Sequence, residues 1–112
     1  MGIIIRLVIN ALAVFITAKI IPGVIVADLY SALITALVLG LANTFIKPVL
    51  LFFTLPLTLL TLGLFTLVVN AIIILIVDYF VPGFMVNGFF TALLFSIVLS
   101  IIASVAIKFV ND

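Results

Sequence analysis

Four long runs of apolar residues, separated by prolines, glycines and single charges, constrain this chain more than any other feature of its sequence. Each run is close to the roughly 20 residues that a helix needs to cross the hydrocarbon core of a bilayer. Hydrophobic residues make up 70% of the 112 residues and charged residues only 6%. A water-soluble fold of this size needs more polar surface than such a composition supplies. We therefore predict an all-α integral membrane protein with one membrane domain over residues 1–112.

Residues that start or stop helices set the limits of the predicted spans. The pairs Pro22-Gly23 and Pro82-Gly83 stop helices. Asp28 is a suitable N-cap for the second run, which Lys47-Pro48 closes. The predicted transmembrane spans are residues 3–21, 29–46, 62–80 and 89–107.

Residues 47–61 do not fit this scheme simply. They are apolar, but Pro56 interrupts them, and three threonines give them a weak polar edge. One interpretation is a longer second helix or a segment that lies along the bilayer surface, with Lys47 as its anchor. The other is a re-entrant loop that lines a pathway, because irregular backbone at membrane depth must be buried in protein or water.

The chain contains an internal repeat of sixty residues. Residues 4–47 and 64–107 are identical at 12 of 44 positions. Apolar composition inflates such matches, but it does not explain why Asn10-Ala11 and Pro22-Gly23 recur sixty residues later. We predict two copies of one helical hairpin, related in parallel by an axis along the membrane normal. Residues 1–18 resemble a signal peptide, but cleavage would discard part of the first copy, so we expect a retained signal anchor.

Charged residues predict the orientation. With four spans, both termini share a side with residues 47–61. That side carries Arg6, Lys47 and Lys108, whereas the other side carries Lys19, Asp28 and Asp78. Three cations against one predict an N-in/C-in protein by the positive-inside rule. A salt bridge between Lys19 and Asp78 is one interpretation of the far side, and a proton or ion site at Asp78 is the other.

Three asparagines, Asn10, Asn43 and Asn70, fall within the predicted spans and in the same half of the membrane. An amide that faces lipid is costly, so we expect these side chains to point inward. As structural residues they would bond to one another or to backbone carbonyls across helices. As functional residues they would form a polar constriction for water, ions or a headgroup.

Small residues recur at every fourth position of the second and fourth spans. The two ridges are Ala32, Ala36, Gly40 and Thr44, and Ala92, Ser96, Ser100 and Ser104. Ridges of this kind let helices approach closely, either within one chain, which we favour, or between copies. A nucleophilic serine would need a base, and the chain has no His.

Missing residue types exclude much chemistry. The chain has no Cys, no His and no Glu, and its net charge is only +1. Thiolate, imidazole and paired-carboxylate sites are therefore excluded, as is a nucleic-acid footprint. We predict a protein that is not an enzyme, with no cofactor or metal, and with the lipid bilayer and further copies of the chain as partners.

An ordered set of motifs covers most of the chain. It consists of the run Leu39–Pro48, then Leu55-Pro56-Leu57, Thr61–Phe65, Val69-Asn70-Ala71 and Val81-Pro82-Gly83-Phe84. This set resembles the small bacterial four-span proteins of phage holin superfamily IV. The resemblance implies four spans in a bacterial inner membrane and offers no catalytic residue to carry over.

Holins self-associate in the cytoplasmic membrane and open lesions through which a cell-wall hydrolase leaves. The resemblance therefore makes a holin-like, membrane-permeabilising role the leading hypothesis. Many holins end in a Lys/Arg-rich tail, from which the short ending Lys108–Asp112 departs. The alternatives are a structural or envelope-stress protein that does not conduct, and a small transporter or lipid-handling protein built around the asparagines and residues 49–61.

Overall fold

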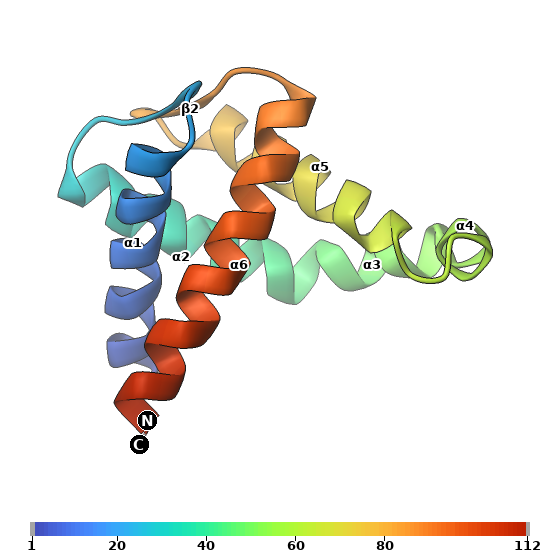
Figure 1. Cartoon of the computed structure of the whole chain (residues 1–112), viewed down its shortest axis with the longest axis horizontal. Helices are drawn as coiled ribbons and strands as arrows, with labels where there is room; N and C mark the ends of the chain where they lie inside the picture. The colour runs from blue at the N-terminus through green and yellow to red at the C-terminus, as the bar shows by residue number, and fades with distance from the viewer. Residues whose placement is uncertain (1, 112) are drawn as a thin grey trace.

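Prolines, glycines and one capping carboxylate set the limits of the helices in the computed structural model, which describes residues 2–111. The elements in chain order are α1 (Ile3–Ile20), β1 (Val24–Val26), α2 (Leu29–Phe45), α3 (Lys47–Phe53), α4 (Leu55–Leu60), α5 (Phe65–Phe80), β2 (Phe84–Val86) and α6 (Phe89–Asn111) (Figure 1). The chain is mostly helical, as predicted, and its four longest helices overlap the four predicted spans. Asp28 caps α2, because its Oδ1 accepts a hydrogen bond of 2.8 Å from the Ser31 N–H.

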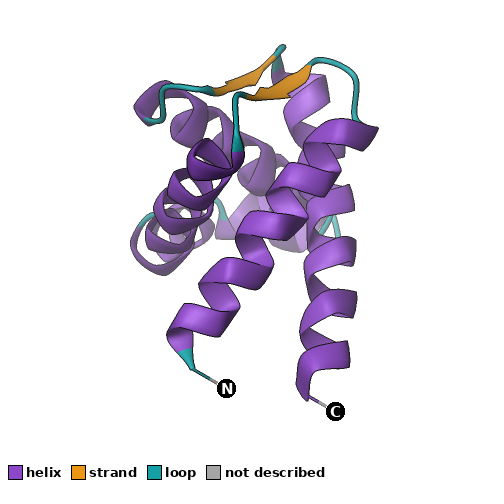
Figure 2. Ribbon diagram, turned by 90° about the vertical axis from the view of Figure 1, so that its left-hand side faces the viewer, coloured by secondary structure: helices purple, strands orange, loops and turns teal. Residues whose placement is uncertain are grey.

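The four long helices pack as a ring. α1 lies against α2 and α6, and α5 lies against α6 and α2. α1 begins and α6 ends at one end of the molecule, which we call the open end (Figures 1 and 2). The two strands lie at the opposite end, which we call the ribbon end (Figure 2).

The strands form an antiparallel ribbon that the all-α prediction did not include. The register pairs Val24 with Val86, Ile25 with Met85 and Val26 with Phe84. Two backbone hydrogen bonds of 2.8 Å extend the ladder, from Ala27 N–H to Gly83 O and from Asn87 N–H to Gly23 O. Three-residue strands are too short to show an alternating pattern, and each partner lies about sixty residues away. The ribbon is therefore an addition to the predicted spans in a chain that is otherwise mostly helical.

Two glycines turn the chain from helix into ribbon. Gly23 has a φ of +92° and Gly83 a φ of +89°, a region that disfavours residues with a Cβ. A Cβ at Gly83 would also lie 2.5 Å from Ser31 Oγ, and one at Gly23 would lie 3.3 Å from Asn87 Cβ. The ribbon therefore packs directly on the loops that lead into α2 and α6.

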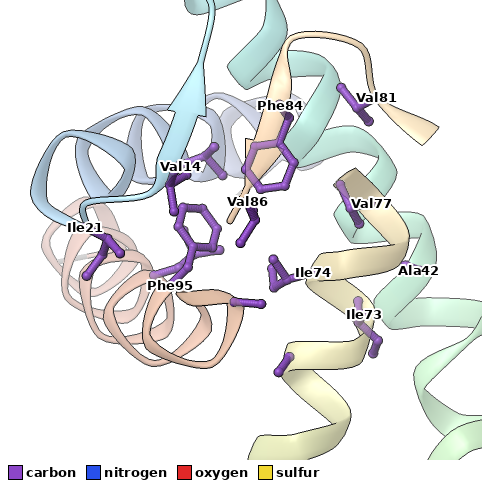
Figure 3. Close-up of a cluster of buried hydrophobic side chains, with 14 of the residues drawn as sticks. Val14, Ile21, Ala42, Ile73, Ile74, Val77, Val81, Phe84, Val86 and Phe95 are labelled. Carbon is purple, nitrogen blue, oxygen red and sulfur yellow. The ribbon is translucent and has the colours of Figure 1, made fainter. Parts of the chain in front are cut away.

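The largest fully buried side chains gather beneath the ribbon (Figure 3). The rings of Phe84 and Phe95 are both fully buried, and their centroids lie 5.5 Å apart. Val14 and Val77 pack in the same cluster from α1 and α5 (Figure 3). The core therefore joins all four long helices to the ribbon, because α2 contributes buried alanines to the same cluster.

Residues 47–61 are helical for most of their length. α3 continues α2 after a bend of 41°, and α3 and α4 then leave the ring to one side (Figure 1). The hydroxyls of Thr54, Thr58 and Thr61 donate to carbonyl oxygens four residues earlier, at 2.7, 3.1 and 2.9 Å. The polar edge of the segment is thus satisfied by its own backbone, while most of its phenylalanines and leucines are exposed.

The helices differ in whether they are long enough to cross a membrane. Within residues 2–111, α1 and α6 are each long and apolar enough to cross a membrane. α2 and α3 meet the same test together as a bent pair, and α5 has 16 residues.

Candidate functional site

A polar cleft lies among the four long helices, between the middle of the molecule and the open end. It consists of two adjoining cavities of about 150 and 70 Å³, which together we call the polar cleft. Leu39, Asn43, Leu99 and Ser100 line both cavities and so form their common wall. α2 and α6 therefore supply the boundary between the two parts.

The three asparagines predicted within spans all line this cleft. Asn10 lines the larger cavity, Asn70 lines the smaller one, and Asn43 lines both. Asn10 lies about 10 Å from the start of α1, at 1.5 Å per helical residue. Within residues 2–111, none of the side-chain hydrogen bonds involves these amides. The three amides therefore line the cleft without a hydrogen bond to the described part of the chain.

The serines that line the cleft differ from the asparagines. Ser96 donates to Leu93 O at 2.9 Å, and Ser100 donates to Ser96 O at 2.8 Å. Each serine hydroxyl thus uses its proton on its own helix and presents lone pairs to the cleft. The asparagine amides remain the principal hydrogen-bond donors on its walls.

The cleft is closed toward the ribbon. Val14 and Ile74, both buried, line its walls, and the Phe95 and Phe84 rings fill the space beyond them (Figure 3). A polar path from the open end therefore stops at an apolar core that occupies the ribbon half.

A wider space adjoins the cleft between α1 and α2. It has a volume of about 480 Å³, and Asn10, Ala36 and Gly40 line both it and the larger cavity of the cleft. We call this space the α1–α2 wedge. Its other lining residues are Ile3, Ile4, Arg6, Leu7, Leu37, Leu41 and Thr44. One cation thus lies in an otherwise mostly aliphatic opening beside the cleft.

The two predicted ridges of small residues divide into a buried and an exposed half. Ala32, Ala36, Ala92 and Ser96 are buried, whereas Gly40, Thr44, Ser100 and Ser104 are exposed. A Cβ at Gly40 would meet no atom within 4 Å. The buried half of each ridge therefore packs within the chain, whereas in the open half the wedge and the cleft separate the helices.

The predicted interface charges have separate surroundings. Arg6 lines the wedge, Lys47 lines the smaller cavity of the cleft, and Lys108 is exposed near the end of α6. At the ribbon end, Lys19 Nζ lies 5.0 Å from the centroid of the Phe15 ring. Asp78 Oδ2 accepts a hydrogen bond of 3.3 Å from the Val86 N–H of the ribbon.

Asp78 and Lys19 thus each contact a group other than the opposite charge, which the sequence offered as one possible partner. The carboxylate of Asp78 holds β2 against the end of α5, and the lysine lies over an aromatic ring, where a cation is attracted to the π-face. This arrangement makes Asp78 part of the attachment of the ribbon.

Sequence reasoning did not place Gly40 and Lys47 in the site. Gly40 was assigned to a packing ridge and Lys47 to the membrane interface. Together with Ala36 and Asn43 they have the spacing i, i+4, i+7 and i+11, which follows one face of a helix despite the bend at residue 46. This spacing in the sequence could have placed Gly40 and Lys47 on the same helix face as Asn43.

The side chains that line the cleft are mainly hydrogen-bonding and aliphatic groups. Among the described residues, no three His, Cys, Asp or Glu side chains gather to hold a metal ion. Its walls offer amides, serine oxygens and one lysine, and neither cavity is lined by a carboxylate. Such a surface suits a polar or anionic group rather than a cation.

The sequence also places the chain among known proteins. Residues 1–105 match the family described as "Mycobacterial 4 TMS phage holin, superfamily IV". The chain belongs to this family. This phage-holin-family chain is therefore a membrane protein, in agreement with its apolar helices.

Two relatives of this holin-family chain come from bacteria. The uncharacterized membrane protein YvlD of Bacillus subtilis (strain 168) is 36% identical over 98 residues, which are 87% of this chain and 82% of the relative. The uncharacterized protein SCO3922 of Streptomyces coelicolor is 42% identical over 84 residues, which are 71% of this chain and 67% of the relative. No solved structure matches the chain significantly.

Proposed function

We propose that this holin-family protein is a non-enzymatic protein of the bacterial inner membrane that binds the polar part of a phospholipid in its polar cleft. One observation carries the proposal: Asn10, Asn43 and Asn70, from three different helices, line one cleft without hydrogen bonds to the protein. Unpaired amides at membrane depth are costly unless water or a ligand bonds to them. A bound headgroup would meet that need.

The proposed arrangement in the bilayer has four spans formed by α1, α2 with α3, α5 and α6. The family description, with its four segments, supports this count. α5, with 16 residues, is only about 24 Å long, so the bilayer would thin beside it or its apolar flanks would enter the core. α3 and α4 would then lie at the inner interface as a bent extension of the second span.

We further propose that the two hairpins are copies of one unit related by a two-fold axis along the membrane normal. In the ribbon, Ile25 pairs with Met85, the residue sixty positions later. The two extending bonds, from Ala27 to Gly83 and from Asn87 to Gly23, also exchange under a shift of sixty. Asn10 and Asn70 take equivalent places in the two adjoining cavities, which supports the same axis.

An N-in/C-in orientation would put the open end and the cleft on the cytoplasmic side. Arg6, Lys47 and Lys108 support it through the positive-inside rule. Cysteines introduced at Gly2 and Phe109 should be protected from an impermeant thiol reagent in intact cells, whereas one at Asn87 should react. Reaction of both Gly2→Cys and Phe109→Cys from outside would reverse the orientation and move the cleft to the outer leaflet.

Retention of phospholipid tests the proposed binding. The purified chain in detergent should carry phospholipid that native mass spectrometry detects. Asn10→Leu and Asn70→Leu should each weaken retention at least about threefold, the value of one hydrogen bond between polar groups in a membrane. Asn87→Leu, which makes the same change on an exposed loop, is the matched control. Equal retention in all three variants would refute binding in the cleft.

The holin-like role is the second candidate, and one observation favours it. The exposed halves of the two ridges, at Gly40, Thr44, Ser100 and Ser104, contain small or hydroxylated residues that could pack against another copy. A single chain is closed by the Phe84 and Phe95 core, so a lesion would require such self-association. Overexpression should then collapse the membrane potential of cells, and Ser104→Leu should abolish this effect without loss of the protein from the membrane.

A further inference from the structure

We propose that the α1–α2 wedge is the lateral entry to the polar cleft, and that Arg6 makes it selective for an anionic phospholipid. This inference rests on the proposed headgroup binding and adds to it the lipid class and the route. The wedge and the cleft share Asn10, Ala36 and Gly40, so a molecule in the wedge borders the amides directly. An amphiphile could therefore keep its chains between α1 and α2 while its headgroup turns inward.

The lining of the wedge has the two chemistries that a phospholipid needs. Aliphatic side chains such as Ile4, Leu7 and Leu41 form its walls, and they suit acyl chains. Arg6 is the only charged residue among its lining. A guanidinium binds a phosphate through paired hydrogen bonds. In a zwitterionic headgroup, the cation next to the phosphate repels the guanidinium and weakens this attraction. The volume of about 480 Å³ lies within the range of small-molecule sites.

Charge complementarity favours an anion throughout this region. Lys47 adds a second cation at the smaller cavity of the cleft. Among the described residues, the acidic side chains are Asp28 and Asp78, which belong to the ribbon end, and neither lines the cleft or the wedge. The occupant is therefore an anionic lipid of the leaflet that surrounds the open end, rather than a cation or a neutral solute.

Gly40 forms the threshold between the two spaces. It lines both, and a Cβ placed on it meets no atom within 4 Å. A larger side chain there starts from open space and would extend into the passage. Gly40→Leu should therefore block the entry of lipid into the cleft without lowering the stability of the fold. Val105→Phe is its control, because it adds bulk at an exposed position of α6 that lines neither space.

Photocrosslinking of the full chain in nanodiscs tests the inference. The probes are phosphatidylglycerol and phosphatidylcholine with a photoreactive group near the headgroup, and the labelled residues are mapped by mass spectrometry. We expect phosphatidylglycerol to label the wedge and cleft with about fivefold preference, which corresponds to roughly 1 kcal/mol for one interfacial cation. Arg6→Gln should remove the preference, and Arg6→Lys should keep part of it. Gly40→Leu should lower labelling of the cleft residues of α6 and leave labelling of the α1 end of the wedge.

The outcomes separate this inference from the proposed function. Equal labelling of the cleft by both lipids, or an unchanged preference in Arg6→Gln, would overturn the anionic selectivity while headgroup binding stands. Cleft labelling that Gly40→Leu leaves unchanged would overturn the route through the wedge. Labelling spread evenly over the apolar surface, with none in the cleft, would overturn both proposals. No labelling of the wedge by either lipid would overturn the wedge as a lipid site.

Discussion

The ribbon half and the open half of this bundle are built from the same four helices but differ in packing and polarity. In the ribbon half, Phe84, Phe95 and their aliphatic neighbours fill the space between the helices, and the ribbon closes the end (Figure 3). In the open half, the wedge and the cleft lie between the helices, and asparagines line them. Because lipid gives helices no hydrophobic drive to associate, close packing must supply the stability. The ribbon half therefore stabilises the fold, and the open half is available for binding.

Phe95→Ala should lower stability more than any of the following substitutions. A small loss would contradict the assignment of the ribbon half as the stabilising half. The ring is fully buried beneath the ribbon, so its loss leaves a cavity and removes dispersion contacts. We expect a loss of roughly 2–3 kcal/mol, below the value for soluble cores, because the transfer from water contributes little in a bilayer. Unfolding in mixed micelles measures it. Phe90→Ala, on an exposed side chain of the same helix, is the control and should change little.

Two glycine substitutions, one in each half, should change the free energy of unfolding in opposite directions. Gly83→Ala should destabilise by about 1–3 kcal/mol, because Gly83 has a positive φ and its Cβ would lie against Ser31. Gly40→Ala should stabilise by about 0.5–1 kcal/mol, because Gly40 lies within α2 and has open space around it. The same unfolding measurement compares both variants. A loss of stability in Gly40→Ala would show that the open half is packed after all.

The cap of α2 should contribute a smaller, pH-dependent increment at the ribbon end. The hydrogen bonds from Ser31 hold the pKa of the Asp28 carboxyl below its ordinary value. A lowered pKa in the folded state means that the stabilisation is complete above the pKa of the unfolded chain and is lost as the pH falls through the folded value. Asp28→Asn keeps a capping acceptor but does not titrate. Wild type should be slightly more stable than this variant at pH 7, and the difference should disappear in acid.

Asn70→Leu should have the smallest effect on stability. The Asn70 amide makes no hydrogen bond within the described residues, so its removal leaves no partner unsatisfied. We expect a change within about 0.5 kcal/mol, together with the loss of phospholipid retention proposed above. A loss of stability comparable to that of Phe95→Ala would restore a structural role for the asparagines and remove the functional distinction between the two halves.

Much of this site could be predicted, because its residues carry local signals. Asn10, Asn43 and Asn70 are conspicuous as amides within apolar runs, and a shared depth predicts a shared site. The wedge had no such signal. Its walls are aliphatic residues like those that face lipid elsewhere, and only the position of α2 relative to α1 makes them a cavity. Gly40 carried no such signal either, since a glycine on a helix is equally suited to close packing and to an opening.

By itself, the sequence determined that this protein belongs in a bilayer, where its long helices begin or end at the ribbon, and which polar groups they carry. These properties depend on composition and on neighbours along the chain, such as the Pro-Gly pairs and the Asp28 cap. Only the tertiary structure decided that β1 pairs with β2, that the aromatic core closes one half, and that three asparagines meet in the other. These features depend on how helices rotate and separate around one another. That geometry is set by contacts between residues far apart in the chain, which no local pattern records.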